Sequence, residues 1–346
     1  MAEMSPWDEE CDEDGYLLLH ADPLGILSST RQVVEQGEHA WINRDRLSRL
    51  SLQWAQQAGE STTPGVSVWD ERYHFNDGTE RTINWLLVLD AVNFCFWAEK
   101  DQPRWSIEYK GETLNGYWAE AAALTRAVEE GKPLWDATYL STMSAEDLAH
   151  IFRGTRRMPL FEERLHNIQQ VGSVLLARFG GQFSQAIEQA KGSAPQLATL
   201  IAREFPSFHD TAHYRNREVG FFKRAQICVA DLHSACAGQR WGEFANLDQL
   251  TIFADYKLPQ VLRHFGVIAY DPALAARVDA QELLEPAGSE EVEIRAITVW
   301  ACELLRQEMA AHGCAMTAME IDQRLWLLGQ NLTGMQPYHR AYTIYY

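Results

Sequence analysis

The segment of residues 79–99, TERTINWLLVLDAVNFCFWAE, is apolar on nearly every side and places the strongest constraint on the fold. A helix that is apolar all round is stable only when other elements enclose it, so this segment is predicted to be a buried helix. Asp90, Asn93 and Trp97 would share one face of that helix. Buried polar groups need hydrogen-bond partners, and either another helix or a bound ligand would supply them here.

The rest of the chain also has mainly helical periodicity. Residues 105–118, WSIEYKGETLNGYW, alternate in polarity around Lys110-Gly111 and predict one small β-hairpin. No internal repeat or linker is visible in the 346 residues, so we expect a mostly α protein with a single compact helical domain over residues 23–346. Residues 1–22 are acidic and are expected to form a flexible N-terminal arm.

The net charge of −18 limits the partners of the chain. It repels long polyanions, so no direct nucleic-acid partner is expected, whereas a pocket for a small anion needs only a few donors. No apolar run approaches the ~18–20 residues of a membrane span, and the N-terminus has no signal-peptide pattern, so no membrane partner is expected. The six cysteines lack CxxC spacing. A reduced, cytoplasmic protein without a structural zinc site fits best.

Residues 251–260, TIFADYKLPQ, place Asp255 among bulky aromatic and aliphatic residues. Desolvating a carboxylate costs free energy, so such a group needs a partner or a function. Pro259 favours a helix start and Gly266 would end that helix, which leaves Asp255 just before a helix N-terminus. Two interpretations stay open: Asp255 caps the helix, or it holds a negative charge beside an electron-poor reaction centre.

Three further features place polar groups in apolar or aromatic surroundings. In a helix expected over residues 219–238, Lys223 and Asp231 lie two turns apart on roughly one face, either as an ion-paired stripe or as part of a site. His74 lies between two aromatic residues, where a structural role is the more common one. The chain ends QPYHRAYTIYY, which has the composition of a segment buried in a groove rather than of a loose terminus.

The common phosphate-loop, dinucleotide-binding, zinc-protease and nucleophile-elbow motifs are absent from the sequence. What remains is a carboxylate among aromatic residues, basic residues on an apolar helix and a tyrosine-rich C-terminus. Aromatic rings stack on planar heterocycles, Lys and Arg with tyrosine hydroxyls bind phosphate, and a carboxylate stabilises an oxocarbenium-like sugar. Together these features describe a hydrolase of a nucleotide N-glycosidic bond.

Six segments resemble, in the same order, those of the queuosine salvage protein family. They are LDAVNFCFWAE (89–99), YKGETLNGYW (109–118), FFKRAQICVADL (221–232), TIFADYKLPQVL (251–262), EVEIRA (291–296) and HRAYTIYY (339–346). The resemblance extends from about residue 23 to the last residue. It implies a helical fold related to that of DNA glycosylases, no metal and no cofactor. It also implies hydrolysis of queuosine 5′-monophosphate, which releases the base queuine for salvage into tRNA modification.

The resemblance further implies roles for single residues. Asp255 matches the catalytic aspartate, and the sequence leaves open whether it acts electrostatically or as a nucleophile. Lys223, Tyr256 and Tyr346 match positions around the 5′-phosphate. The residues that match positions around the 7-deazaguanine base are His74, Asn93, Phe94, Asp231 and Phe253. Lys257 stands where family members have Arg, which puts a bidentate contact at this position in doubt.

Two other classes of function stay open from the sequence. The chain is a non-catalytic nucleotide-binding or scaffold protein on the same helical fold if Asp255 is only a cap. A polynucleotide glycosylase is the other alternative, and the net charge of −18 counts against it.

Overall fold

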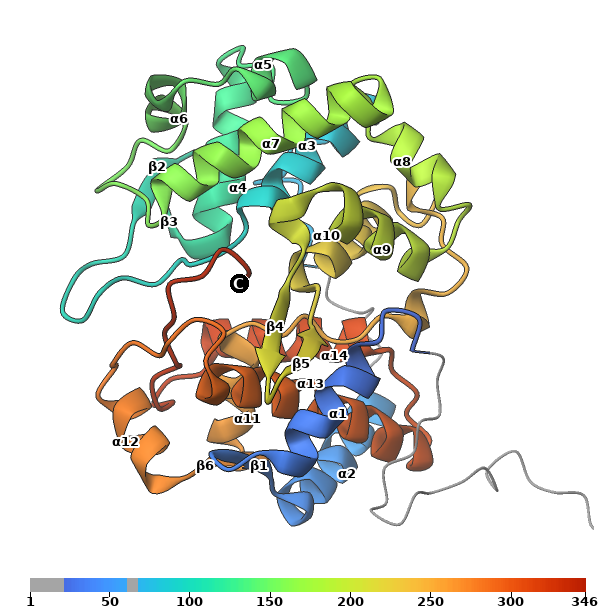
Figure 1. The fold of residues 1–346 in the computed structure, drawn as a ribbon, viewed down its shortest axis with the longest axis vertical. Helices are drawn as coiled ribbons and strands as arrows, with labels where there is room; N and C mark the ends of the chain where they lie inside the picture. The colour runs from blue at the N-terminus through green and yellow to red at the C-terminus, as the bar shows by residue number, and fades with distance from the viewer. Residues whose placement is uncertain (1–21, 61–67) are drawn as a thin grey trace, which may run out of the picture.

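The computed structural model describes residues 22–60 and 68–346, without the side chains of residues 58–60. The acidic arm expected over residues 1–22 lies outside the described residues, except for its last residue. Helices dominate the described chain, which confirms the predicted fold class (Figure 1). None of them, within the part of the chain that the structure describes, is both long and apolar enough to span a bilayer.

The elements follow one another along the chain as shown in Figure 1. The α-helices are α1 (Ile26–Gln36), α2 (Arg44–Glu60), α3 (Glu80–Val92), α4 (Gly116–Glu129), α5 (Ala137–Ser141), α6 (Ala145–Ile151), α7 (Phe161–Phe179), α8 (Ser184–Gln189), α9 (Ala194–Glu204), α10 (Lys223–Ala235), α11 (Lys257–His264), α12 (Pro272–Asp279), α13 (Ser289–Ala311) and α14 (Ala318–Asn331). The strands are β1 (Ala40–Ile42), β2 (Ser106–Tyr109), β3 (Glu112–Asn115), β4 (Thr211–Tyr214), β5 (Arg217–Gly220) and β6 (Ile268–Tyr270).

The described strands form small antiparallel pairs. The predicted hairpin is present as β2–β3. The sequence does not predict a second hairpin, β4–β5, or the pairing of β1 with the distant β6. The turn of β4–β5 contains no glycine and uses Arg215 and Asn216 at φ 46° and 66°, so the usual turn signal is missing. Because β5 occupies the start of the helix predicted over residues 219–238, α10 begins only at Lys223.

Helix α3 is the buried helix that the sequence predicts, with every residue from 82 to 92 buried. It ends there, however, rather than at residue 99. The chain leaves the helical conformation at Asn93 (φ −76°, ψ 74°) and adopts a positive φ of 48° at Cys95. The prediction that Asp90, Asn93 and Trp97 share one helical face is therefore wrong, because only Asp90 lies in the helix.

A buried arginine explains the early end of α3. Arg164 on α7 is fully buried, and its guanidinium donates hydrogen bonds to the carbonyl oxygens of Phe94 and Cys95. It also pairs with Glu120 on α4 at 2.8 Å. The Cys95 N–H donates to the carbonyl oxygen of Tyr346 at 2.9 Å. These tertiary partners satisfy backbone groups that a longer helix would have paired internally.

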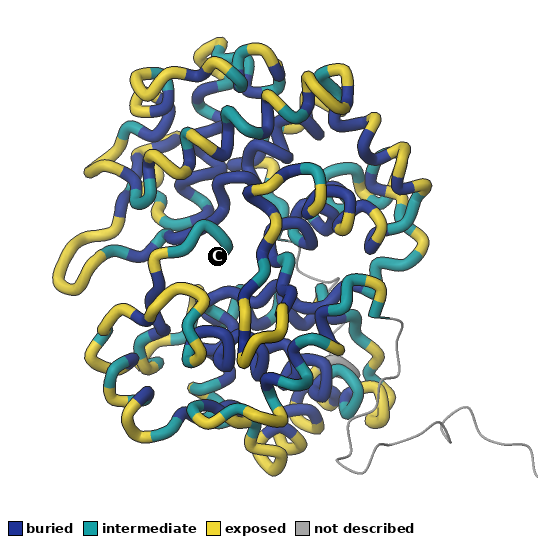
Figure 2. Tube along the Cα trace, viewed as in Figure 1, coloured by how far each residue is buried: buried dark blue, intermediate teal, exposed yellow. Residues whose placement is uncertain are grey.

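Two apolar cores lie on either side of the C-terminal segment (Figures 1 and 2). Helices α3–α10 and the β2–β3 hairpin build most of one core, and α1, α2, α11–α14 and the remaining strands build the other. A smaller cluster between them joins Phe94, Cys95 and Trp97 to Tyr256 and Tyr346. Tyr346 is only 2% exposed, so the C-terminus is buried as predicted.

Candidate active site

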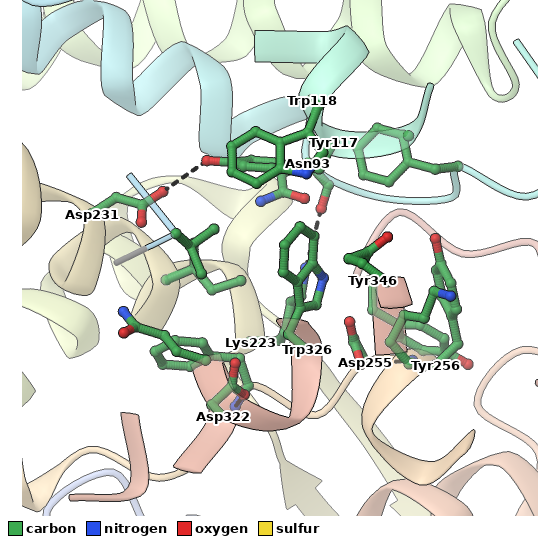
Figure 3. A pocket seen from close by; sticks show the side chains of 18 of the residues that line it. Asn93, Tyr117, Trp118, Lys223, Asp231, Asp255, Tyr256, Asp322, Trp326 and Tyr346 are labelled. Atoms are coloured by element: carbon green, nitrogen blue, oxygen red, sulfur yellow. Dashed lines mark hydrogen bonds between the residues drawn. The ribbon is translucent and has the colours of Figure 1, made fainter. Parts of the chain in front are cut away.

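A cavity opens where α10, α14, the segment 253–257 and the C-terminus meet (Figure 3). The loop after α3 and the start of α4 complete its wall. The space between the walls, including the open mouth, is about 930 Å³. Most of the predicted site residues line this cavity: Asn93, Lys223, Asp231, Phe253, Asp255, Tyr256 and Tyr346.

Asp255 precedes α11 and is 8% exposed. Its Oδ1 accepts hydrogen bonds from the backbone N–H groups of Lys257 at 2.7 Å and Leu258 at 2.9 Å, which confirms the capping interpretation. Within the described residues, its Oδ2 forms no hydrogen bond. Burial raises the pKa of the Asp255 carboxyl, and the positive charge of Lys223 opposes this effect. The cap thus engages only one of the two carboxylate oxygens.

Among the described cations, Lys223 has the largest electrostatic effect on the Asp255 carboxylate. It opens α10, is 5% exposed, and its Nζ lies 3.4 Å from the carbonyl oxygen of Asn93. Burial lowers the pKa of Lys223, whereas Asp255, Asp322 and Asp90 raise it in that order. The buried ammonium group of Lys223 therefore interacts electrostatically with several buried carboxyl groups.

Asp322 on α14 is a buried carboxyl in the cavity that the sequence analysis missed. Its Oδ2 accepts a hydrogen bond from the Phe253 N–H at 2.7 Å. Burial and the neighbouring charge of Asp255 raise the pKa of Asp322 well above its usual value. Trp326 and Gln330 line the cavity from the next two turns of the same helix. Their spacing of four residues was the available sequence signal.

At one end of the cavity, aromatic rings from α4 and α14 surround polar groups (Figure 3). The ring of Trp326 lies 5.9 Å from that of Tyr117 and 5.7 Å from that of Trp118, at interplanar angles of 86° and 70°. Asp231 on α10 places its Oδ2 3.4 Å from the Tyr117 hydroxyl. Burial raises the pKa of the Asp231 carboxyl to about 7. This end suits a planar ring with polar edges.

Two predicted site residues, His74 and Phe94, do not line the cavity. His74 is buried behind Tyr117, with its Nε2 2.8 Å from the Tyr117 hydroxyl and its Nδ1 2.7 Å from the carbonyl oxygen of Asp70. Burial lowers the pKa of His74 to about 4, so the ring is neutral at pH 7. Phe94 is fully buried beneath the Arg164 guanidinium, 4.3 Å from its ring centre. Both residues lie behind the residues that line the cavity, and their expected contact with a base stays a prediction.

Another part of the cavity combines tyrosines with two cations. The ring of Tyr256 lies 4.8 Å from that of Tyr338. Arg104 donates from Nη2 to the Tyr338 hydroxyl at 2.9 Å, and Lys257 donates from Nζ to a backbone carbonyl oxygen of α14 at 3.2 Å. Among the residues that the structure describes, neither cation forms an ion pair with a carboxylate. Cations and hydroxyl groups without acidic partners suit an anion.

Fold and cavity together define a class of protein. A helical scaffold around a cavity with aromatic, cationic and carboxylate parts is typical of an enzyme acting on a small molecule with planar and anionic groups. Within residues 22–60 and 68–346, no group of three or more His, Cys, Asp or Glu side chains is arranged to hold a metal ion. The family model described as "Queuosine salvage protein" matches residues 73–346. The chain belongs to this family.

Relatives named queuosine 5′-phosphate N-glycosylase/hydrolase align over nearly their whole length. The relative from Sphaerobacter thermophilus is 49% identical over 94% of this chain and 98% of its own. Those from Dictyostelium discoideum and Mus musculus are 37% and 33% identical, each over 94% of this chain and over 100% and 99% of their own.

Proposed function

We propose that this chain hydrolyses the N-glycosidic bond of queuosine 5′-phosphate and releases queuine for salvage into tRNA modification. Its relatives are named for this activity, and the similarity covers both chains almost completely. The structural observation that supports the proposal best is Asp255, a buried cavity carboxylate with one oxygen left free by the helix cap. We assign the activity to the unit over residues 23–346.

The base is proposed to lie against Tyr117, Trp118 and Trp326, the aromatic end of the cavity. Rings meeting at steep angles form a pocket in which a flat heterocycle stacks on one face and is bounded by others. Asn93 and Asp231 supply the polar atoms that meet the edge of the base.

The 5′-phosphate is proposed to lie beside Tyr256 and Tyr346, as the resemblance implies. Arg104 and Lys257 line the same cavity and have no acidic partner within the described residues, so we add them to the phosphate contacts. Lys223 was expected at the phosphate as well. Its position among buried carboxyl groups supports a further role, which is to keep Asp255 ionised.

The reaction then follows from the placement of charge. As the bond from the anomeric carbon C1′ to the base lengthens, positive charge develops on the ribose. Asp255 stabilises this charge, either through space or by attack on C1′, and water completes the hydrolysis. Burial strengthens the electrostatic effect because water screens less inside the cavity.

Incubation of the protein with queuosine 5′-phosphate, followed by chromatography for free base, tests this function. We expect queuine and ribose 5-phosphate in equal amounts. A protein that binds the nucleotide and returns it intact would be a binding or scaffold protein instead. Base release from tRNA or DNA, with binding that weakens as salt is added, would indicate a polynucleotide glycosylase.

A further inference from the structure

Asp231 lies at the aromatic end of the cavity beside a second buried acid. Asp90, on the neighbouring helix α3, is completely buried. Within the described residues, neither carboxylate oxygen of Asp90 has a partner with the distance and angle of a hydrogen bond. The side chains of Asn93 and Cys228 are its polar neighbours. Two neighbouring buried carboxyl groups do not both ionise, because each negative charge disfavours the other.

The hydrogen bonds behind Tyr117 indicate where a proton lies. His74 Nδ1 lies 2.7 Å from the carbonyl oxygen of Asp70 and 3.2 Å from the Asp70 backbone nitrogen. The carbonyl oxygen is the nearer atom, and two facing lone pairs would repel each other at 2.7 Å, so we place the ring hydrogen on Nδ1. In the neutral ring, Nε2 is then an acceptor, so the Tyr117 hydroxyl donates its single hydrogen to Nε2 at 2.8 Å. The one hydroxyl hydrogen of Tyr117 has two possible acceptors, His74 Nε2 at 2.8 Å and Asp231 Oδ2 at 3.4 Å. With the hydrogen on the nearer acceptor, Nε2, the Tyr117 oxygen offers only lone pairs to Asp231.

Lone pairs of Tyr117 facing Asp231 are favourable only if the Asp231 carboxyl carries a hydrogen. We propose that Asp231 is protonated in the resting enzyme and acts as the general acid that protonates the departing base. The inference rests on the proposed function and adds a catalytic role to a residue expected only to bind the base. His74 and Tyr117 are positioning residues in this arrangement, because they fix the direction of the hydrogen bond.

The chemistry of the substrate makes such an acid useful. A 7-deazaguanine has carbon in place of N7, so the base cannot be protonated there as a purine can. Without a proton it would leave as an anion, which is a poor leaving group. An acid at the edge of the base must therefore act on another heteroatom of the ring system.

The step balances in atoms and electrons. The C1′–N bond breaks, and its electron pair goes to the base. The Asp231 hydrogen passes to a heteroatom of the base, which leaves Asp231 as a carboxylate. Water forms the new C1′–O bond and releases one proton. Asp231 takes up a proton from solvent after queuine departs, so one water is consumed in each turnover.

The charged and titratable groups facing Asp231 come from its own helix and two others. Lys223 on α10 favours the ionised form of Asp231, and Cys228 lies one turn away on the same helix. Burial and the neighbouring charge of Asp231 raise the pKa of Asp90 on α3 well above its usual value. Tyr117 on α4 is buried and un-ionised, since burial and the nearby acids raise its pKa well above the usual value. Burial is the largest effect and favours the protonated carboxyl.

Asp231→Asn tests the proton transfer directly. The amide keeps the size of the side chain and can donate N–H to the Tyr117 oxygen, but it has no proton to transfer. We expect kcat for queuosine 5′-phosphate to fall roughly 10²–10⁴-fold. Hydrolysis of p-nitrophenyl β-ribofuranoside 5-phosphate should fall far less, because nitrophenolate leaves without protonation. An equal fall for both substrates, or no fall, would overturn the inference.

Tyr117→Phe provides a second test with the natural substrate. It asks in which direction the alkaline decrease of kcat moves along the pH axis. Wild-type kcat should decrease as Asp231 ionises on the alkaline side. Removing an acceptor for the Asp231 hydrogen destabilises the protonated form, so this decrease should move to lower pH. If Tyr117 instead donates to an Asp231 carboxylate, the decrease would move to higher pH and the inference would fail.

Asp231→Asn is also the control for the pH profiles. Because it has no carboxyl group at this position, its kcat should not decrease on the alkaline side. Failure of the proposed function is a separate outcome. In that case the wild-type protein itself would release no base from queuosine 5′-phosphate.

Discussion

Replacing Asp255 by Asn separates the charge of this side chain from its structural contact. An asparagine oxygen can accept the same two hydrogen bonds from the backbone N–H groups of Lys257 and Leu258. We therefore expect the free energy of unfolding to stay within about 1 kcal/mol of wild type. The variant loses the negative charge that faces the developing sugar cation. Loss of one preorganised electrostatic group lowers the rate roughly 10²–10³-fold, or about 2.7–4 kcal/mol in the barrier.

Asp255→Ala is the matched comparison. It removes the charge and the cap together, so a stability loss of about 0.5–2 kcal/mol should accompany the lower rate. Urea unfolding gives the stabilities, single-turnover release of queuine gives the rates, and calorimetry checks that both variants still bind the nucleotide. If Asp255→Asn turns over like wild type while only Asp255→Ala is impaired, Asp255 is a cap and not a catalytic group.

Three further predictions concern the buried charges. Lys223→Met should raise the pKa of Asp255 further, because Lys223 favours its ionised form. The decrease of kcat on the acidic side should then move to higher pH. If it does not move, Lys223 does not keep Asp255 ionised. Arg164→Met leaves Glu120 buried without its partner and should cost about 3–5 kcal/mol in urea unfolding; adding Glu120→Leu should recover part of this loss, whereas a single-variant cost below about 1 kcal/mol would contradict the pairing. Because burial raises the pKa of Asp90 in the folded protein, its stabilising contribution is present at low pH and is lost as pH rises through that pKa. Asp90→Asn should therefore weaken the decline of unfolding free energy as pH rises above the usual carboxyl pKa of about 4, and an unchanged slope would contradict this prediction.

The features that the sequence predicts correctly are those with a local cause. The apolar run over residues 82–92 is a buried helix because no face of it can meet water. The side chain of Asp255 contacts amides two and three residues further along, so its cap is encoded within one short stretch. Lys223 and Asp231 are both at the cavity because two helical turns return to the same face.

What the sequence does not predict depends on distant partners. The carbonyl groups that end α3 are held by Arg164, which lies about seventy residues further along the chain. The sequence analysis names His74 as a site residue and does not name Tyr117. Only the packed structure shows that Tyr117 faces the cavity and His74 lies behind it. The sequence analysis names no site residue on the helix of Asp322 and Trp326, although every fourth residue of a helix points to one face.

A crystal structure of the Asp255→Asn variant with intact queuosine 5′-phosphate would test the central claim most directly. We predict that C1′ lies in contact with the side chain at position 255 and that the base lies against Tyr117 and Trp326, with an edge at Asp231. A nucleotide bound with C1′ away from position 255, or outside this cavity, would contradict the account.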